Sequence, residues 1–138
     1  MKKKLFNISV VLLGSMFLFA MISGFTYNQG QDPWPVPDKY KTMVNPLKGD
    51  AASVAEGKSI YTQHCVSCHG KKGKGDGPKA AQLETESGDF TSPDFQKQTD
   101  GAIFYKTSEG RKDMPSFKKK IPDADGIWSV ANYLRTLK

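Results

Sequence analysis

One stretch of the sequence decides the fold: residues 61–70, which read YTQHCVSCHG. It holds both cysteines of the chain, spaced C-x-x-C, with a histidine directly after the second. C-x-x-C-H is the attachment pattern of c-type haem. Two thiols at this spacing reach the two vinyl groups on one edge of the porphyrin, and the adjacent histidine reaches the iron. The pattern therefore predicts one covalent haem c on Cys65 and Cys68, with His69 as the proximal iron ligand.

Other chemistries use paired cysteines, and three of them remain as alternatives. A redox dithiol of the thioredoxin kind needs a βαβ setting, which the sequence lacks. A zinc site needs further ligands, and the only other histidine is His64, beside Cys65. A structural disulfide across two residues closes a very small loop and stabilises little. Haem is the reading that these residues favour.

A haem iron held by His69 needs a second axial ligand from far along the chain. Met114 is the candidate, because it stands with Pro115 in a polar loop, 111–120, where an apolar side chain has no packing reason to be. The alternatives are Met43, the one other methionine beyond the N-terminal apolar run, and a Met114 that is simple filler. His64 abuts the attachment motif, so we expect it to face solvent and not to reach the opposite side.

The periodicity outside the motif is helical. Ser53 with Glu56 has the form of a capping box and predicts a helix from there to about Gln63. No segment alternates with period two, so an all-α domain is expected. Further helical segments are expected at three places: a short turn over 79–83, a helix from Thr99 or Asp100 to Gly110, and a last helix from Pro122–Asp123 with a stripe of Ile127, Val130, Ala131 and Leu134.

Length and charge set limits on the function. The 138 residues allow one small domain, and the formal net charge is +6. Three of the basic residues, Lys2, Lys3 and Lys4, belong to the N-terminal segment, so residues 25–138 carry 17 basic against 14 acidic side chains, or +3. This excess is too small for a nucleic-acid-binding protein, and no nucleic-acid partner is expected.

The N-terminus predicts export. Residues 1–25 combine the lysines with an apolar run at 5–22, which reads as a signal peptide or as a retained membrane anchor. The domain is then periplasmic, either soluble or tethered to the cytoplasmic membrane. Residues 26–50 contain four prolines, which favour extended chain over a regular helix, and form either a packed arm or a linker. The functional domain is expected at 51–138.

The chain resembles the class I (mitochondrial-type) cytochromes c, of the bacterial single-haem kind, over about residues 53–138. Gly57 and Tyr61 match the glycine and aromatic of the family's first helix, and Val130 and Tyr133 match their partners on its last helix. The pair Met114–Pro115 matches the family's Met-Pro pair. The resemblance implies a cytochrome c fold: three to four short helices and loops wrapped around one covalently bound haem. It also implies that the carbonyl of Pro78 accepts a hydrogen bond from the ring of His69.

Six-coordinate iron leaves no open position for a substrate, so electron transfer in a respiratory chain is expected and enzymatic catalysis is not. The alternatives are an electron-relay subunit of a larger oxidoreductase complex and a haem-based ligand sensor or peroxidase with a labile Met114. Lysines after the haem motif and after the methionine loop suggest docking to acidic redox partners, unless they are ordinary solvated side chains. They are Lys71, Lys72, Lys74, Lys118, Lys119 and Lys120.

Overall fold

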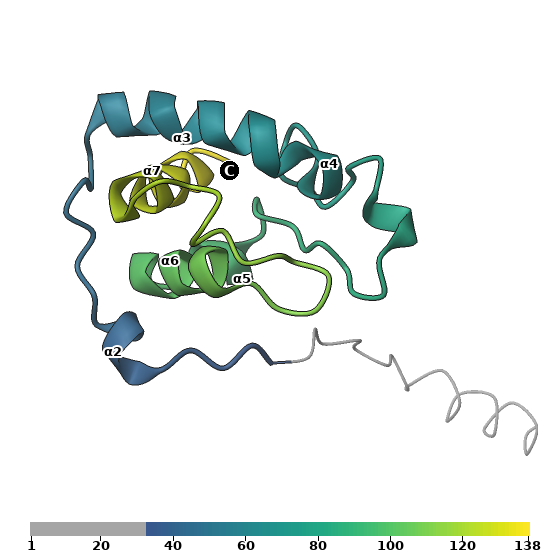
Figure 1. The fold of residues 1–138 in the computed structure, drawn as a ribbon, viewed down its shortest axis with the longest axis horizontal. Coiled ribbons are helices and arrows are strands. Elements are labelled where there is room, and N and C mark those ends of the chain that lie inside the picture. Colours follow the sequence, from purple (N-terminus) through teal and green to yellow (C-terminus); the bar gives the residue numbers. More distant parts are fainter. Residues whose placement is uncertain (1–32) are drawn as a thin grey trace, which may run out of the picture. The chain divides into compact units, whose positions relative to one another are not determined.

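The computed structural model describes residues 33–138, which form helices joined by long loops, with no strand in this part of the chain (Figure 1). The predicted signal or anchor at 1–25 and the first part of the arm, 26–32, lie outside the described residues. None of the helices between residues 33 and 138 has the length and apolar character needed to cross a bilayer. The elements are α2 (Asp38–Lys41), α3 (Ala51–His64), α4 (Val66–His69), the 3₁₀ turn η1 (Ala80–Gln82), α5 (Pro93–Gln96), α6 (Asp100–Glu109) and α7 (Ala124–Leu134).

The first long helix, α3, begins earlier than the capping box predicted. Asp50 is its N-cap, and its side chain accepts a hydrogen bond from the backbone N–H of Ala52 at 2.8 Å. Ser53 lies inside the helix and is buried, while Glu56 accepts a hydrogen bond from the Ser129 hydroxyl at 3.0 Å. The prediction was wrong because an aspartate just upstream caps equally well, which leaves both side chains free to face α7.

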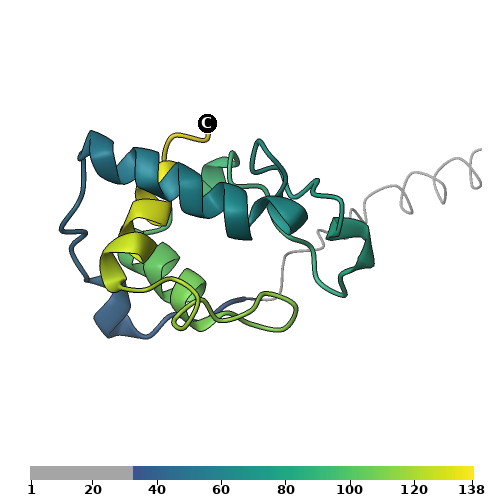
Figure 2. The same cartoon turned by 45° about the horizontal axis from the view of Figure 1, so that its top comes forward.

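The core is organised by the crossing of α3 over α7, which both views show (Figures 1 and 2). At the crossing, a Cβ on Gly57 would stand 1.9 Å from the backbone oxygen of Ser129, so only glycine permits the two helices to approach this closely. Beside it, the rings of Tyr61 and Tyr133 lie 5.1 Å apart, and Val130 is buried. The predicted contact of Gly57 and Tyr61 with Val130 and Tyr133 is confirmed.

The boundaries of the two other main helices follow their sequence signals. The Thr99 side chain accepts from the N–H of Ala102 and starts α6, and Gly110, at φ +69°, ends it. Asp123 caps α7 through the N–H of Gly126. The predicted stripe of α7 is buried. The single turn α5 was not predicted; Ser92 caps it through the N–H of Phe95.

The proline-rich arm contains one helical turn, α2, so the expectation of extended chain in place of a helix was wrong for these four residues. Pro37 precedes the turn, where no N–H is needed, and residues 38–41 contain no proline. The arm contacts the rest of the compact unit formed by residues 34–138. The rings of Tyr40 and Tyr105 lie 4.6 Å apart, and the Asn45 amide donates to the Asn132 side chain at 2.7 Å. Residues 34–50 therefore pack against α6 and α7.

Candidate haem-binding site

The C-x-x-C-H motif forms a tight turn at the end of α3. Cys65 caps α3, with its N–H donating to the Tyr61 carbonyl at 2.9 Å, and the one-turn helix α4 follows. Within the motif, the N–H of His69 donates to the Cys65 carbonyl at 2.9 Å. The turn brings both cysteines and the histidine together at the C-terminal end of α3. One planar group bound by all three residues requires them to be this close.

The glycine-rich loop that follows the motif stabilises this turn. Three backbone N–H groups, of Gly75, Gly77 and Lys79, donate to the carbonyls of residues 69, 68 and 67 at 3.0, 3.1 and 2.8 Å. Carbonyls at a helix C-terminus lack partners inside the helix, and the loop supplies them. A Cβ on Gly77 would lie 2.5 Å from the Ser67 carbonyl oxygen, so glycine is needed for the loop to approach the motif.

The imidazole of His69 is held in an apolar setting and carries no charge at neutral pH. Its ring stacks on the ring of Phe90 with centroids 4.4 Å apart and 25° between the planes. Burial lowers the pKa of His69 to about 4, an effect that a hydrogen bond with the Ser87 backbone opposes in part. Neutral imidazole is the form that binds metals. The Nδ1 atom is buried without a hydrogen-bond partner in the described part of the chain.

That unpartnered Nδ1 bears on Pro78. The expected hydrogen bond from the His69 ring to the Pro78 carbonyl is not formed in this structure, and it stays a prediction for the haem-bound protein. Pro78 does lie in the loop that hydrogen-bonds to the motif, between Gly77 and Lys79.

The two cysteines are free thiols, partly buried, and form no disulfide with each other. Burial, with a smaller effect of Cys68, raises the pKa of the Cys65 thiol to about 12. Reactive cysteines and zinc ligands need a thiolate, which an electropositive setting favours. The setting of Cys65 therefore argues against a redox dithiol.

A zinc site also lacks support, because residues 33–138 contain no group of three or more histidine, cysteine, aspartate or glutamate side chains placed to bind a metal. A haem needs two free thiols and a neutral buried imidazole with a nitrogen to spare, and all three are present. The residues present fit that group.

Met114 lies in the loop between α6 and α7 and is half-buried, packed against the central apolar cluster. Its backbone pairs with Arg111 through two hydrogen bonds, of 2.8 and 2.9 Å. The close approach of this loop to the end of α6 depends on Gly110, where a Cβ would stand 2.5 Å from the Met114 carbonyl oxygen. The methionine predicted as axial ligand is thus held in place and is not a stray surface residue.

The two alternative ligands are placed differently. Met43 is on the arm, 37% exposed, beside Gly101 at the start of α6. His64 is the last residue of α3, and its ring lies 6.0 Å from that of Phe117.

The six predicted docking lysines lie on two loops and are exposed. Lys71, Lys72 and Lys74 follow α4, and Lys118–Lys120 precede α7. Lys118 forms an ion pair with Glu109, and the ammonium of Lys120 lies 5.4 Å from the centre of the Phe117 ring. The second run is therefore partly engaged within the molecule.

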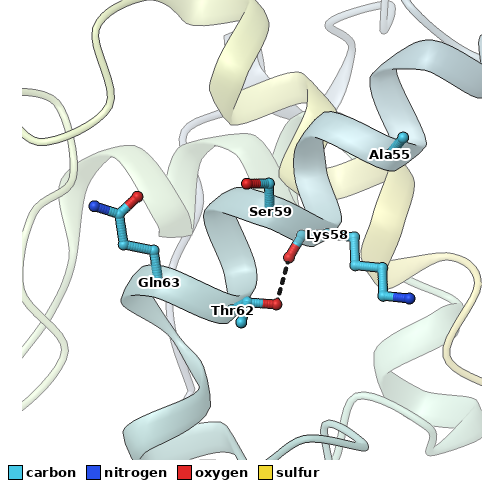
Figure 3. A pocket seen from close by; sticks show the side chains of 5 residues that line it. All are labelled: Ala55, Lys58, Ser59, Thr62 and Gln63. Carbon is cyan, nitrogen blue, oxygen red and sulfur yellow. Dashed lines mark hydrogen bonds between the residues drawn. The ribbon is translucent and has the colours of Figure 1, made fainter.

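A surface hollow lies on the outer face of α3, lined by Ala55, Lys58, Ser59, Thr62 and Gln63 (Figure 3). The one hydrogen bond drawn there runs from the Thr62 hydroxyl to the Lys58 carbonyl and belongs to the helix itself. None of the predicted haem-site residues lines this hollow.

Comparison with known families now decides the class of protein. The family described as "Cytochrome C oxidase, cbb3-type, subunit III" matches residues 52–134, more than half of the chain. The chain belongs to this family. This c-type cytochrome has the expected cytochrome c fold, all-α with three main helices, and the fold class and the predicted resemblance are confirmed.

The relatives of this cytochrome include an oxidase subunit and a cytochrome c6. It is 30% identical over 101 residues to the cbb3-type cytochrome c oxidase subunit CcoP of Azospirillum brasilense, covering 72% of this chain and 33% of that protein. It is 31% identical over 88 residues to cytochrome c6 of a Picosynechococcus species, covering 61% of this chain and 73% of that one. The chain thus spans about a third of the CcoP relative and most of the cytochrome c6.

Two solved structures are similar. A chain of the reducing HAO-like protein complex of Kuenenia stuttgartiensis matches with a TM-score of 0.59 and 28% identity, over 78% of this chain and 51% of that one. The KustC0563 c-type cytochrome matches with a TM-score of 0.52 and 27% identity, over 59% of this chain and 96% of that one. The second match shows that nearly the whole of a small cytochrome corresponds to part of this chain.

Proposed function

We propose that this cytochrome is a single-haem electron carrier of a respiratory chain. Cys65 and Cys68 would hold haem c covalently, and His69 and Met114 would be its two axial ligands. The observation that carries the proposal is the C-x-x-C-H turn, with both thiols free and a buried, neutral His69 beside them. Membership of a c-type cytochrome family supports the covalent haem.

When bound, the haem supplies a reversible one-electron change at its iron. The protein's part is to bind the haem, to orient the ligands of its iron and to shield the iron from other ligands. Phe90 stacks on His69 and fixes the plane of its ring. The Gly75–Lys79 backbone fixes the turn that carries the thiols. A methionine sulfur as second ligand fills the open position and raises the reduction potential, which favours electron transfer over ligand chemistry.

Two further parts of the proposal concern place and partner. The basic N-terminal segment with its apolar run supports export to the periplasm, as a soluble or a tethered protein. The two lysine loops support docking to acidic redox proteins, with an attraction that weakens as salt rises.

A second candidate, an electron-relay subunit of a larger oxidoreductase, is favoured by two comparisons. The CcoP relative is an oxidase subunit three times as long as the matching region, and one similar structure is part of a complex. Purification separates the two functions. A free carrier is recovered alone and monomeric from gently lysed cells, whereas a relay subunit is recovered with its enzyme.

The proposal is tested by visible spectroscopy of protein made in a host that attaches haem. We expect a c-type pyridine haemochrome spectrum and only weak binding of carbon monoxide by the reduced wild type. Met114→Ala should open the sixth position and permit carbon monoxide to bind more tightly. Met43→Ala is the matched control and should behave as wild type. Tighter carbon monoxide binding by Met43→Ala, with Met114→Ala unaltered, would reassign the ligand.

A further inference from the structure

The backbone of Arg111 determines where Met114 stands. Each of the two residues donates its N–H to the carbonyl of the other, at 2.8 and 2.9 Å, and they form an isolated antiparallel bridge. Because these two hydrogen bonds join the residues, the backbone of Met114 cannot move far unless Arg111 moves too. Gly110 lets the loop that holds both fold closely onto the end of α6.

An aromatic ring from the other end of the chain lies on Arg111. The centre of the Trp34 ring is 4.7 Å from the Arg111 guanidinium carbon and 5.6 Å from the ammonium of Lys106 on α6. A cation over the face of an indole ring is attracted by the negative face of the ring. The two cations repel each other, and burial together with Arg111 lowers the pKa of Lys106. Trp34 therefore joins the methionine loop to α6 at a point where their charges alone would separate them.

The arm that carries Trp34 is itself fixed at two other points. At α2, a Cβ on Gly101 would stand 1.9 Å from the Tyr40 carbonyl oxygen, so the arm lies directly on the start of α6. Farther along, Asn45 is buried and bonds to Asn132 of α7 at 2.7 Å. Trp34 thus belongs to an arm that is anchored on α6 and α7.

We propose that Trp34 is a positioning residue for Met114, which it holds in place by stacking on Arg111. The arm is then part of the ligand site and not a spacer. The proposal rests on the proposed function in so far as Met114 is the axial ligand. It predicts that weakening the contact between the Trp34 ring and Arg111 lets the methionine leave the iron more often. Trp34 does so from a segment about 80 residues away from Met114 in the sequence.

The test uses the haem-loaded protein and two substitutions of one side chain. Trp34→Leu keeps apolar volume and removes the aromatic face, whereas Trp34→Phe keeps a ring. Val44→Ala, an arm residue that is 84% exposed, is the control. The measurements are the affinity of the reduced protein for carbon monoxide and the hydrogen-exchange rates of the Arg111 and Met114 amides.

In Trp34→Leu we expect both quantities to rise about two- to fivefold, the size of one cation–π contact at a partly exposed site. Trp34→Phe keeps an aromatic ring, so both quantities should stay close to their wild-type values. Val44→Ala should leave both unchanged. Unaltered exchange at Arg111 and Met114 in Trp34→Leu would overturn the proposal. So would an equal rise at the Val130 and Ala131 amides in the core, because it would show general loss of stability and not release of the loop.

The two proposals fail separately. If Met114→Ala binds carbon monoxide no better than wild type, Met114 is not the ligand and the proposed coordination is wrong. The exchange rates of the loop amides still decide whether Trp34 holds the loop, since they depend on the hydrogen bonds between Arg111 and Met114 and not on the iron.

Discussion

Replacing Gly57 by alanine tests the helix crossing on which the fold depends. The added Cβ would lie 1.9 Å from the Ser129 carbonyl oxygen, and real Cβ atoms essentially never approach closer than 3.0 Å. One helix must therefore move by about 1.1 Å, and because the obstacle is backbone, no side-chain rotation can relieve it. The movement would separate Tyr61 from Tyr133 and loosen the packing of Val130.

The expected cost follows from two opposing effects. Overpacking a core costs up to about 3 kcal/mol when the surroundings cannot yield, and alanine regains about 1 kcal/mol over glycine inside a helix. The net loss is about 2 kcal/mol, which lowers the melting temperature of a domain of this size by about 8–16 °C. Thermal unfolding followed by far-ultraviolet circular dichroism measures it. The control is Ser59→Ala on the exposed face of the same helix. A Gly57→Ala protein that melts at or above the wild-type temperature would refute the close crossing.

Three more predictions follow from the site and the arm. Gly77→Ala should destabilise the haem-motif turn by about 1–3 kcal/mol and alter the visible spectrum of the loaded protein, whereas Lys74→Ala in the same loop should do neither. Asn132→Ala removes three hydrogen bonds that tie α7 to Asn45, Leu47 and Ser53, so we expect a loss of about 2–4 kcal/mol in denaturant unfolding and faster tryptic cleavage of the arm. Charge reversal at Lys72 should slow reduction by an acidic partner and flatten its salt dependence, while reversal at Lys138 should not; equal effects would argue against a docking loop.

Local signals in the sequence were sufficient for much of the architecture. Thr99 and Asp123 cap their helices as their residue types predict, and Gly110 ends α6. The C-x-x-C-H motif carries its own geometry, because its residues are adjacent. Where the signal depended on choosing between neighbours it failed: Asp50, not Ser53, caps α3, since several residues there have a suitable side chain.

Contacts between distant segments could not be predicted. Phe90 stacks on His69, but in the sequence it is one aromatic residue in a polar loop, with no period to mark its direction. Trp34 and the prolines around it suggested a linker as readily as a packed arm. Its contact with Arg111 joins positions far apart in the chain, and only the folded path of the arm brings them together. Met114 was predicted as a ligand from the chemistry of its sulfur and its place in a polar loop, whereas the backbone bridge that joins it to Arg111 was not predicted.

Intact-mass measurement of the exported protein tests the central claim most directly. After production in a host with haem-attachment machinery, the wild type should carry the added mass of one haem that survives denaturation and acid–acetone extraction. Replacing both Cys65 and Cys68 by serine should remove that mass, and Ser67→Ala, which alters the same turn but no thiol, should keep it. A wild-type protein without added mass, or a double-serine protein that retains it, would contradict covalent haem on this motif.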